Sequence, residues 1–214
     1  LGSDTGRDLT TGDYNVFAGR YGGAGVTTGN RNVGIGSYTL YGIATGSDNV
    51  AIGYEALNKI VGASNNIGIG YRALYETTSG ANHVAVGYEA AKSISTPGSN
   101  VAVGYRAMYV ATSADNNVVV GKDAGQDLTT GVNNTFVGGL AGADVTTGGG
   151  NCCIGAQAGQ NQFTTANYQL YISRNAGGPG SAGVWLYAND SGACYAGNNS
   201  SSFSTTSDRR LKKN

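Results

Sequence analysis

Asn49-Val50-Ala51-Ile52-Gly53 is one copy of a five-residue pattern, Asn-Val-x-Val-Gly, that returns every 17 residues. The spacing holds through nine units without insertion or deletion. A fixed internal period is the signature of stacked repeat architectures, so this spacing decides the fold. The units begin at Asn15, Asn32, Asn49, Asn66, His83, Asn100, Asn117, Asn134 and Asn151.

Each position of the unit, numbered 1 to 17 from the first residue of the pattern, has its own chemistry. Position 5 is glycine in every unit, from Gly19 to Gly155, which predicts a corner that excludes a side chain. Positions 2 and 4 are mostly valine or isoleucine around a small or variable residue. This alternation predicts a short strand whose apolar positions 2 and 4 form its buried face.

The period predicts an all-β fold, a β-solenoid or β-roll in which each 17-residue unit makes one coil. Coils stacked at the strand spacing of about 4.8 Å would give a rod about 43 Å long. A helical repeat is excluded because the units are rich in glycine and β-branched residues and are shorter than a helix pair. The 37 glycines of the chain therefore indicate a stiff rod with repeated corners.

Stacking places equivalent positions above one another, which predicts ladders of side chains. Asparagines at position 1 should form an amide ladder in which His83 is a structural substitute. Tyrosines at position 6 should stack, and charges of alternating sign at position 7 should attract one another. The ladder residues of the central coils are Asn49, Asn66 and Asn100; Tyr54, Tyr71, Tyr88 and Tyr105; and Glu55, Arg72, Glu89 and Arg106.

Position 9 carries larger side chains in the central coils, such as Leu57 and Met108, and glycine at both ends of the array. These side chains either fill a wider core or contact a neighbouring chain. One coil encloses only a few small apolar side chains, which barely offset the entropy of ordering it. We therefore expect several rods to pack side by side, as a homotrimer.

The period divides the chain into three segments. Residues 1–159 are the predicted shaft, and residues 160–206 hold short aromatic strands between polar turns, typical of a β-rich module that caps a solenoid. Residues 207–214 form the one clearly basic run. Candidate glycan-binding aromatics in the cap module are Trp185, Tyr187 and Tyr195, with the module's own core as the competing interpretation.

Composition excludes several classes of function. Thirteen basic and thirteen acidic residues give a net charge of zero, so we expect no nucleic-acid partner. No apolar run approaches the length of a membrane span, and membrane insertion is not expected. We also expect no cofactor and no metal site. Cys152, Cys153 and Cys194 are too few for a disulfide framework and are interpreted as small buried residues.

Two parts of the sequence are similar to known families. The ending Ser207-Asp208-Arg209-Arg210-Leu211-Lys212-Lys213-Asn214 resembles the opening of the intramolecular chaperone domain of phage tail fibres and tailspikes, the S74 peptidase family. The array in residues 1–159 is similar to the Asn-x-Ala-Ile-Gly repeats of phage tail fibres and, more loosely, to the heads of trimeric autotransporter adhesins.

The resemblance implies a virion protein, extracellular in its location: the distal part of a homotrimeric tail fibre. Its partners would be itself, other tail proteins and a host receptor such as a polysaccharide. It also implies one autocatalytic cleavage between Thr206 and Ser207, with Ser207 as nucleophile and Lys212 as general base. The sequence ends eight residues into this motif, which leaves truncation, incomplete processing and an uncleaved tail open.

Competing functions remain at this stage. A bacterial trimeric adhesin or secreted fibre would use the same rod. A left-handed β-helix acyltransferase is a minor alternative, since its coils run in multiples of six and it needs a catalytic histidine, whereas His83 occupies a ladder position. An ice-binding solenoid would need threonines on every coil, and the central coils lack them. Apart from self-cleavage, no enzymatic activity is expected.

Overall fold

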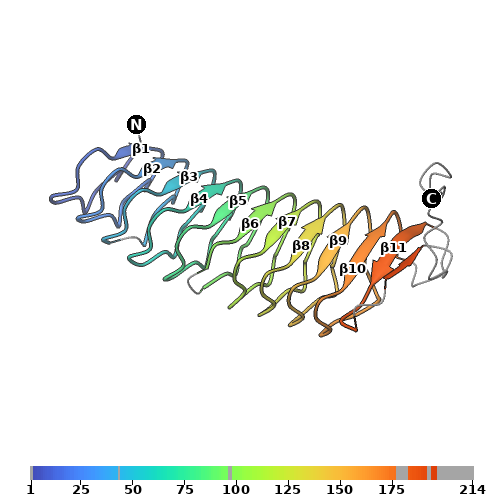
Figure 1. Ribbon diagram of the computed structural model, residues 1–214. Coiled ribbons are helices and arrows are strands. Elements are labelled where there is room, and N and C mark those ends of the chain that lie inside the picture. Colours follow the sequence, from blue (N-terminus) through green and yellow to red (C-terminus); the bar gives the residue numbers. More distant parts are fainter. Residues whose placement is uncertain (1, 43, 96–97, 177–182, 192–193, 197–214) are drawn as a thin grey trace, which may run out of the picture.

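The computed structural model describes residues 2–42, 44–95, 98–176, 183–191 and 194–196. These residues form an all-β solenoid, with no helix among them. Twelve short strands follow one another along the rod in the order of the sequence, as one sheet (Figure 1). The strands are β1 (Val16–Ala18), β2 (Val33–Ile35), β3 (Val50–Ile52), β4 (Ile67–Ile69), β5 (Val84–Val86), β6 (Val101–Val103), β7 (Val118–Val120), β8 (Thr135–Val137), β9 (Cys152–Ile154), β10 (Leu170–Ser173), β11 (Val184–Ala188) and β12 (Cys194–Ala196).

Strands β1 to β10 pair in parallel, and the register aligns equivalent positions of successive units. Val50 pairs with Ile67, for example, and Ile67 pairs in turn with Val84. The predicted coil of 17 residues is therefore confirmed as one turn of the solenoid. Each side chain lies above its counterpart in the previous coil, which is the condition for the ladders described below.

The glycine at position 5 is explained by the approach of the next coil. Gly53 has a φ of 121°, and a Cβ added there would lie 2.6 Å from the carbonyl oxygen of Gly70. Gly36 has a φ of 131° and meets Gly53 in the same way. Both the conformation and the contact exclude a side chain, so the predicted corner is confirmed.

The orientation of the strands differs from the sequence prediction. The residue at position 3 points into the solenoid, and Ala51, Ala85 and Val119 are fully buried there. The valines and isoleucines at positions 2 and 4 are half-buried or exposed on the other side of the sheet; Val16 is 56% and Ile35 43% exposed. The prediction that positions 2 and 4 form the buried face is therefore wrong for this chain. In the coils whose position 9 is leucine or methionine, position 3 is glycine or alanine, and the bulkier aliphatic residues of the strand face outward.

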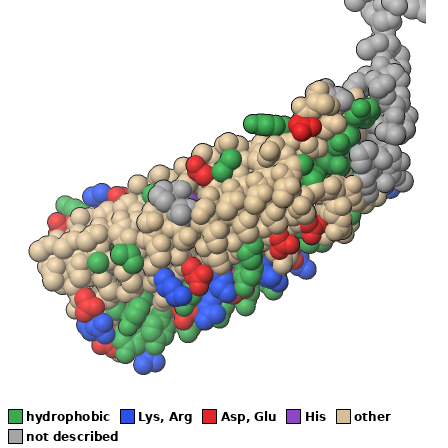
Figure 2. Space-filling view, turned by 90° about the horizontal axis from the view of Figure 1, so that it is seen from below, with side chains coloured by type: hydrophobic (Ala, Val, Ile, Leu, Met, Phe, Trp, Pro, Cys, Tyr) green, Lys and Arg blue, Asp and Glu red, His purple; other side chains and the backbone are tan. Residues whose placement is uncertain are grey.

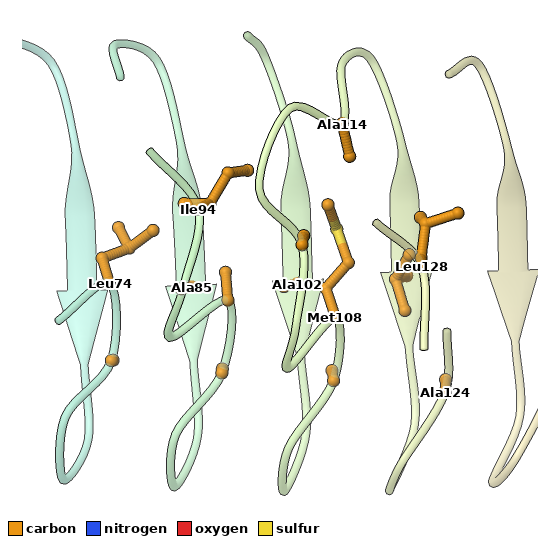
Figure 3. Close-up of a cluster of buried hydrophobic side chains, with 14 of the residues drawn as sticks. Leu74, Ala85, Ile94, Ala102, Met108, Ala114, Ala124 and Leu128 are labelled. Atoms are coloured by element: carbon orange, nitrogen blue, oxygen red, sulfur yellow. The ribbon is translucent and has the colours of Figure 1, made fainter. Parts of the chain in front are cut away.

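Position 9 fills the interior of the rod. Leu57, Leu74 and Met108 are fully buried and pack with alanines and with the apolar residues of position 12 (Figure 3). Where position 3 is instead phenylalanine, position 9 is glycine: a Cβ at Gly23 would lie 2.5 Å from the ring of Phe17. Of the two roles predicted for position 9, the structure supports core filling. Within a coil, a large side chain at position 3 goes with glycine at position 9, and a large side chain at position 9 goes with a small residue at position 3.

The spacing changes after Gly159, but the solenoid continues. Eighteen residues separate Asn151 from Gln169, and Leu170 still pairs in parallel with Cys152. The change of spacing near the boundary predicted between residues 159 and 160 thus reflects one inserted residue in the ninth unit, after which the parallel sheet continues into a tenth strand. Strands β11 and β12 then pair antiparallel to β10 and to each other, and this hairpin covers the last parallel strand.

Candidate functional site

The position-1 asparagines form a continuous buried ladder. The side-chain oxygen of Asn49 accepts the backbone N–H of Asn66 at 3.0 Å and its side-chain amide at 3.1 Å. The Asn66 amide also donates to the carbonyl of Gly80 at 2.9 Å, closing its own coil. Asn100 and Asn117 repeat the same bonds. Every coil is thereby tied to its neighbour in a region closed to water.

His83 is a member of this ladder. The residue is 1% exposed, and its ring Nδ1 accepts the backbone N–H of Asn100 at 3.3 Å. The backbone N–H of His83 donates to the side-chain oxygen of Asn66 at 3.0 Å. These bonds replace those of an asparagine, although the acceptor distance is longer than in the neighbouring coils. The ring therefore acts as a structural substitute, as the sequence suggested.

The position-6 tyrosines stack along one edge of the rod. Ring centroids are 5.6 Å apart between Tyr54 and Tyr71, 4.9 Å between Tyr71 and Tyr88 and 5.2 Å between Tyr88 and Tyr105, with interplanar angles of 9–11°. Neighbouring rings cover one another's faces, and Tyr54, Tyr88 and Tyr105 remain 43%, 44% and 45% exposed.

The stack extends beyond the four tyrosines found in the sequence. Tyr38 meets Tyr54 edge-on at 6.1 Å, and Tyr21 stacks on Tyr38 at 5.1 Å. Both lie at position 7, one residue later in the coil, so a search along position 6 alone misses them. A search that allowed tyrosine at either position 6 or position 7 of each unit would have found them.

Charged side chains lie beside the tyrosines. In the view of Figure 2, most of the visible charged side chains lie along one long edge of the rod. Arg72 bonds Glu55 of the preceding coil at 2.6 Å, the contact that alternating charge predicts. Glu89 instead pairs within its coil with Lys92 at 3.0 Å. Arg106 lies over the ring of Tyr109 at 4.5 Å. The alternating row thus produces one of the expected pairs between coils, together with pairs inside coils.

The face of the sheet that points away from the interior of the solenoid carries the side chains of positions 2 and 4. We call this surface the outer sheet face. It runs from β1 to β10, and its most exposed members include Val118, Val137 and Ile154, at 41%, 36% and 41%. The nine five-residue segments that contain strands β1 to β9 hold no Asp, Glu, Lys or Arg. A long, uncharged aliphatic surface of this kind is typical of a protein interface.

The three aromatic residues proposed for glycan binding lie in the terminal hairpin, in two environments. Trp185 is 64% exposed. Tyr187 packs against the core cluster with its ring 4.9 Å from that of Tyr171, and Tyr195 stacks on Tyr187 at 5.8 Å. Tyr187 thus serves the core of the cap, Tyr195 is half-buried, and Trp185 is the most exposed of the three.

The three cysteines are free thiols. Cys153 points into the core and is fully buried, and burial raises the pKa of its thiol. Cys152 lies at position 2 on the outer sheet face and is half-buried, and burial raises the pKa of its thiol as well. The interpretation as small buried residues therefore fits Cys153 fully and Cys152 in part.

Thr206, Ser207 and Lys212, the predicted cleavage residues, lie outside the described residues. Within the described part of the chain there is no pocket and no cluster of three or more His, Cys, Asp or Glu residues suited to a metal. None of its segments is a helix long and apolar enough to cross a membrane. Comparison with protein families, curated proteins and solved structures finds no match for this chain.

Proposed function

We propose that this chain is the shaft of a homotrimeric fibre that serves host attachment, the distal part of a phage tail fibre. The observation that carries the proposal is the in-register stack of ten parallel strands tied together by the buried amide ladder. Each coil contacts only its neighbours, so the chain builds length and stiffness. A protein that must hold a receptor-binding end away from a particle needs these properties.

The roles of the polar side chains support a structural function. The ladder asparagines and His83 are engaged in bonds between coils, and the tyrosines cover one another. Their chemistry is used to hold the rod together. We therefore propose that the chain performs no catalysis other than its own maturation.

Maturation would proceed by self-cleavage, as the resemblance of residues 207–214 implies. In this proposal Lys212 accepts the proton of the Ser207 hydroxyl, and the hydroxyl oxygen attacks the Thr206 carbonyl carbon. The Ser207 nitrogen leaves and takes up the proton, and water then hydrolyses the ester, which leaves a carboxylate at Thr206 and a free amine at Ser207. The partners would be two further copies of the chain, other tail proteins and a surface polysaccharide of the host. Trp185 is the residue we assign to sugar stacking, because its ring is exposed.

A bacterial trimeric adhesin or secreted fibre is the alternative, because the same rod would serve it. Coding sequence downstream of Asn214 distinguishes the two: a complete chaperone domain supports the phage fibre, and a membrane-anchor barrel supports the adhesin. The acyltransferase alternative is disfavoured by the coil, which closes every 17 residues and uses His83 in its ladder.

Two measurements test the proposal. Sedimentation equilibrium should give the mass of a trimer, and electron microscopy should show rods; a monomer at all concentrations contradicts the homotrimer. In the full-length precursor, mass spectrometry should find a mature chain ending at Thr206, and Ser207→Ala should abolish the cleavage. Cleavage that persists in that variant removes Ser207 from the mechanism.

A further inference from the structure

We infer that the outer sheet face is the surface through which copies of this chain bind one another, parallel and at the same height. The inference rests on the proposed homotrimer and specifies its interface. Three surfaces of the described rod could have served: the outer sheet face, the edge with tyrosines and charges, and the side formed by the turns. The first is distinguished by its chemistry, and its area and pitch indicate which partner it fits.

Chemistry is the first argument. The outer sheet face presents valine, isoleucine and leucine side chains that are half-buried or exposed in the single chain. The nine segments that form it contain none of the 26 acidic and basic residues. The edge of stacked tyrosines, by contrast, carries charged side chains, some of which form ion pairs within the chain, such as Arg72 with Glu55. Burying the aliphatic rows therefore removes apolar area from water without desolvating charge.

Area is the second argument. Ten strands at the usual spacing make the face about 43 Å long, and five residues across make it about 16 Å wide. The resulting footprint is about 700 Å², of the same order as the roughly 800 Å² per partner that stable protein interfaces bury. In a trimer each copy divides this face between its two neighbours, so the face supplies apolar contact to both along the rod.

Pitch is the third argument, and it selects the partner. The aliphatic rows repeat once per coil from β1 to β10. A partner that fits every row must have the same spacing over the same length, and a second copy of this chain has it. In a closed ring of three copies the symmetry axis runs along the rods, so each residue lies level with its equivalents in the other copies.

The arrangement makes a specific prediction for Cys152. This residue lies at position 2 of β9, on the outer sheet face and near the C-terminal end of the rod. In parallel copies the Cys152 thiols meet around the axis. In antiparallel copies each would instead face the N-terminal strands of its partner, which contain no cysteine.

A matched pair of lysine substitutions in one coil tests the face. Val118 on the outer sheet face is 41% exposed and Val132, away from it, is 39% exposed, so either substitution is tolerated by a single chain. Sedimentation equilibrium should show association weakened at least tenfold in Val118→Lys and unchanged in Val132→Lys. Circular dichroism at equal concentrations checks that each variant keeps its β structure.

A cross-linking measurement, which needs no substitution in the face, tests the parallel arrangement. A short bismaleimide added to the Cys194→Ser chain should link Cys152 of one copy to Cys152 of another, and Cys152→Val should abolish the product. The inference is overturned if the wild-type chain associates and Val118→Lys associates equally well, or if the wild-type chain associates and no Cys152 cross-link forms. Either result is still compatible with the homotrimer. A wild-type chain that remains monomeric overturns the homotrimer as well.

Discussion

Replacing the corner glycine Gly53 with alanine tests the packing of one coil on the next. The new Cβ would lie 2.6 Å from the carbonyl oxygen of Gly70, so the two coils must separate by about 0.4 to 0.8 Å to reach ordinary contact. That movement stretches the 2.7 Å bond from the Gly70 N–H to the carbonyl of Ile52 toward the limit of a hydrogen bond. The φ of 121° adds backbone strain for any residue with a side chain.

The magnitude follows from these two effects. Backbone strain of about 1–3 kcal/mol and a weakened hydrogen bond of about 1 kcal/mol give a loss of about 2–4 kcal/mol. For a chain of this size the midpoint of thermal unfolding should fall by roughly 5–15 °C, followed by circular dichroism at equal protein concentration.

Gly139→Ala provides the matched control, because its Cβ would meet nothing closer than the Lys122 carbonyl oxygen, at 3.8 Å. It should be neutral or stabilise by about 0.5–1 kcal/mol through the unfolded state. If Gly53→Ala and Gly139→Ala unfold at the same temperature, the steric explanation of the corner is refuted.

Three further predictions concern the interior. Leu74→Ala removes a fully buried side chain and should lower the free energy of unfolding, measured with denaturant, by about 2–5 kcal/mol. The exposed Val61→Ala should lower it by less than about 0.5 kcal/mol, and equal losses would refute the assigned core. His83→Asn restores the regular amide ladder and should stabilise by about 0.5–1 kcal/mol in the same assay, and a clear loss would show that the ring packs better than the amide it replaces. Burial raises the pKa of the Cys153 thiol, so the folded chain keeps a proton that the unfolded chain releases above pH 9.0. The denaturant concentration at the midpoint of unfolding should therefore fall as the pH rises beyond 9.0, and it should fall less steeply in Cys153→Ala. The same dependence on pH in both chains would contradict this linkage.

The features that depend on the period could be predicted from the sequence. A fixed spacing aligns equivalent residues whatever the detailed path of the coil, so the amide ladder, the tyrosine stack and the corner glycine followed directly. His83 could be placed because the ladder position constrains any residue found there. These predictions needed the alignment of units alone.

The direction of the side chains could not be predicted in the same way. A three-residue strand offers one alternation, and the hydrophobicity of positions 2 and 4 marked them as core. The deciding factor is volume: Ala51 and Ala85 fit between the strand and the buried leucines, where a branched side chain at every coil would not. An aliphatic row that faces outward is invisible to a rule that equates hydrophobic with internal.

The tenth parallel strand was missed for a different reason. One inserted residue breaks the spacing after Gly159, and glutamine replaces asparagine at the ladder position. The backbone N–H of Gln169 nevertheless donates to the Asn151 side chain at 2.8 Å, so the ladder continues. Surface loops absorb an extra residue at little energetic cost, so a change of period need not end the array.

Because each coil consists of one whole repeat unit, the gene can gain or lose complete repeats without disturbing the fold. Duplication or deletion of a complete 17-residue repeat lengthens or shortens the rod by one strand spacing, about 4.8 Å, and leaves the bonds between neighbouring coils equivalent. Partial repeats would shift every ladder out of alignment. Recombination between units could therefore adjust the length of the rod in discrete steps, without redesign of the coil.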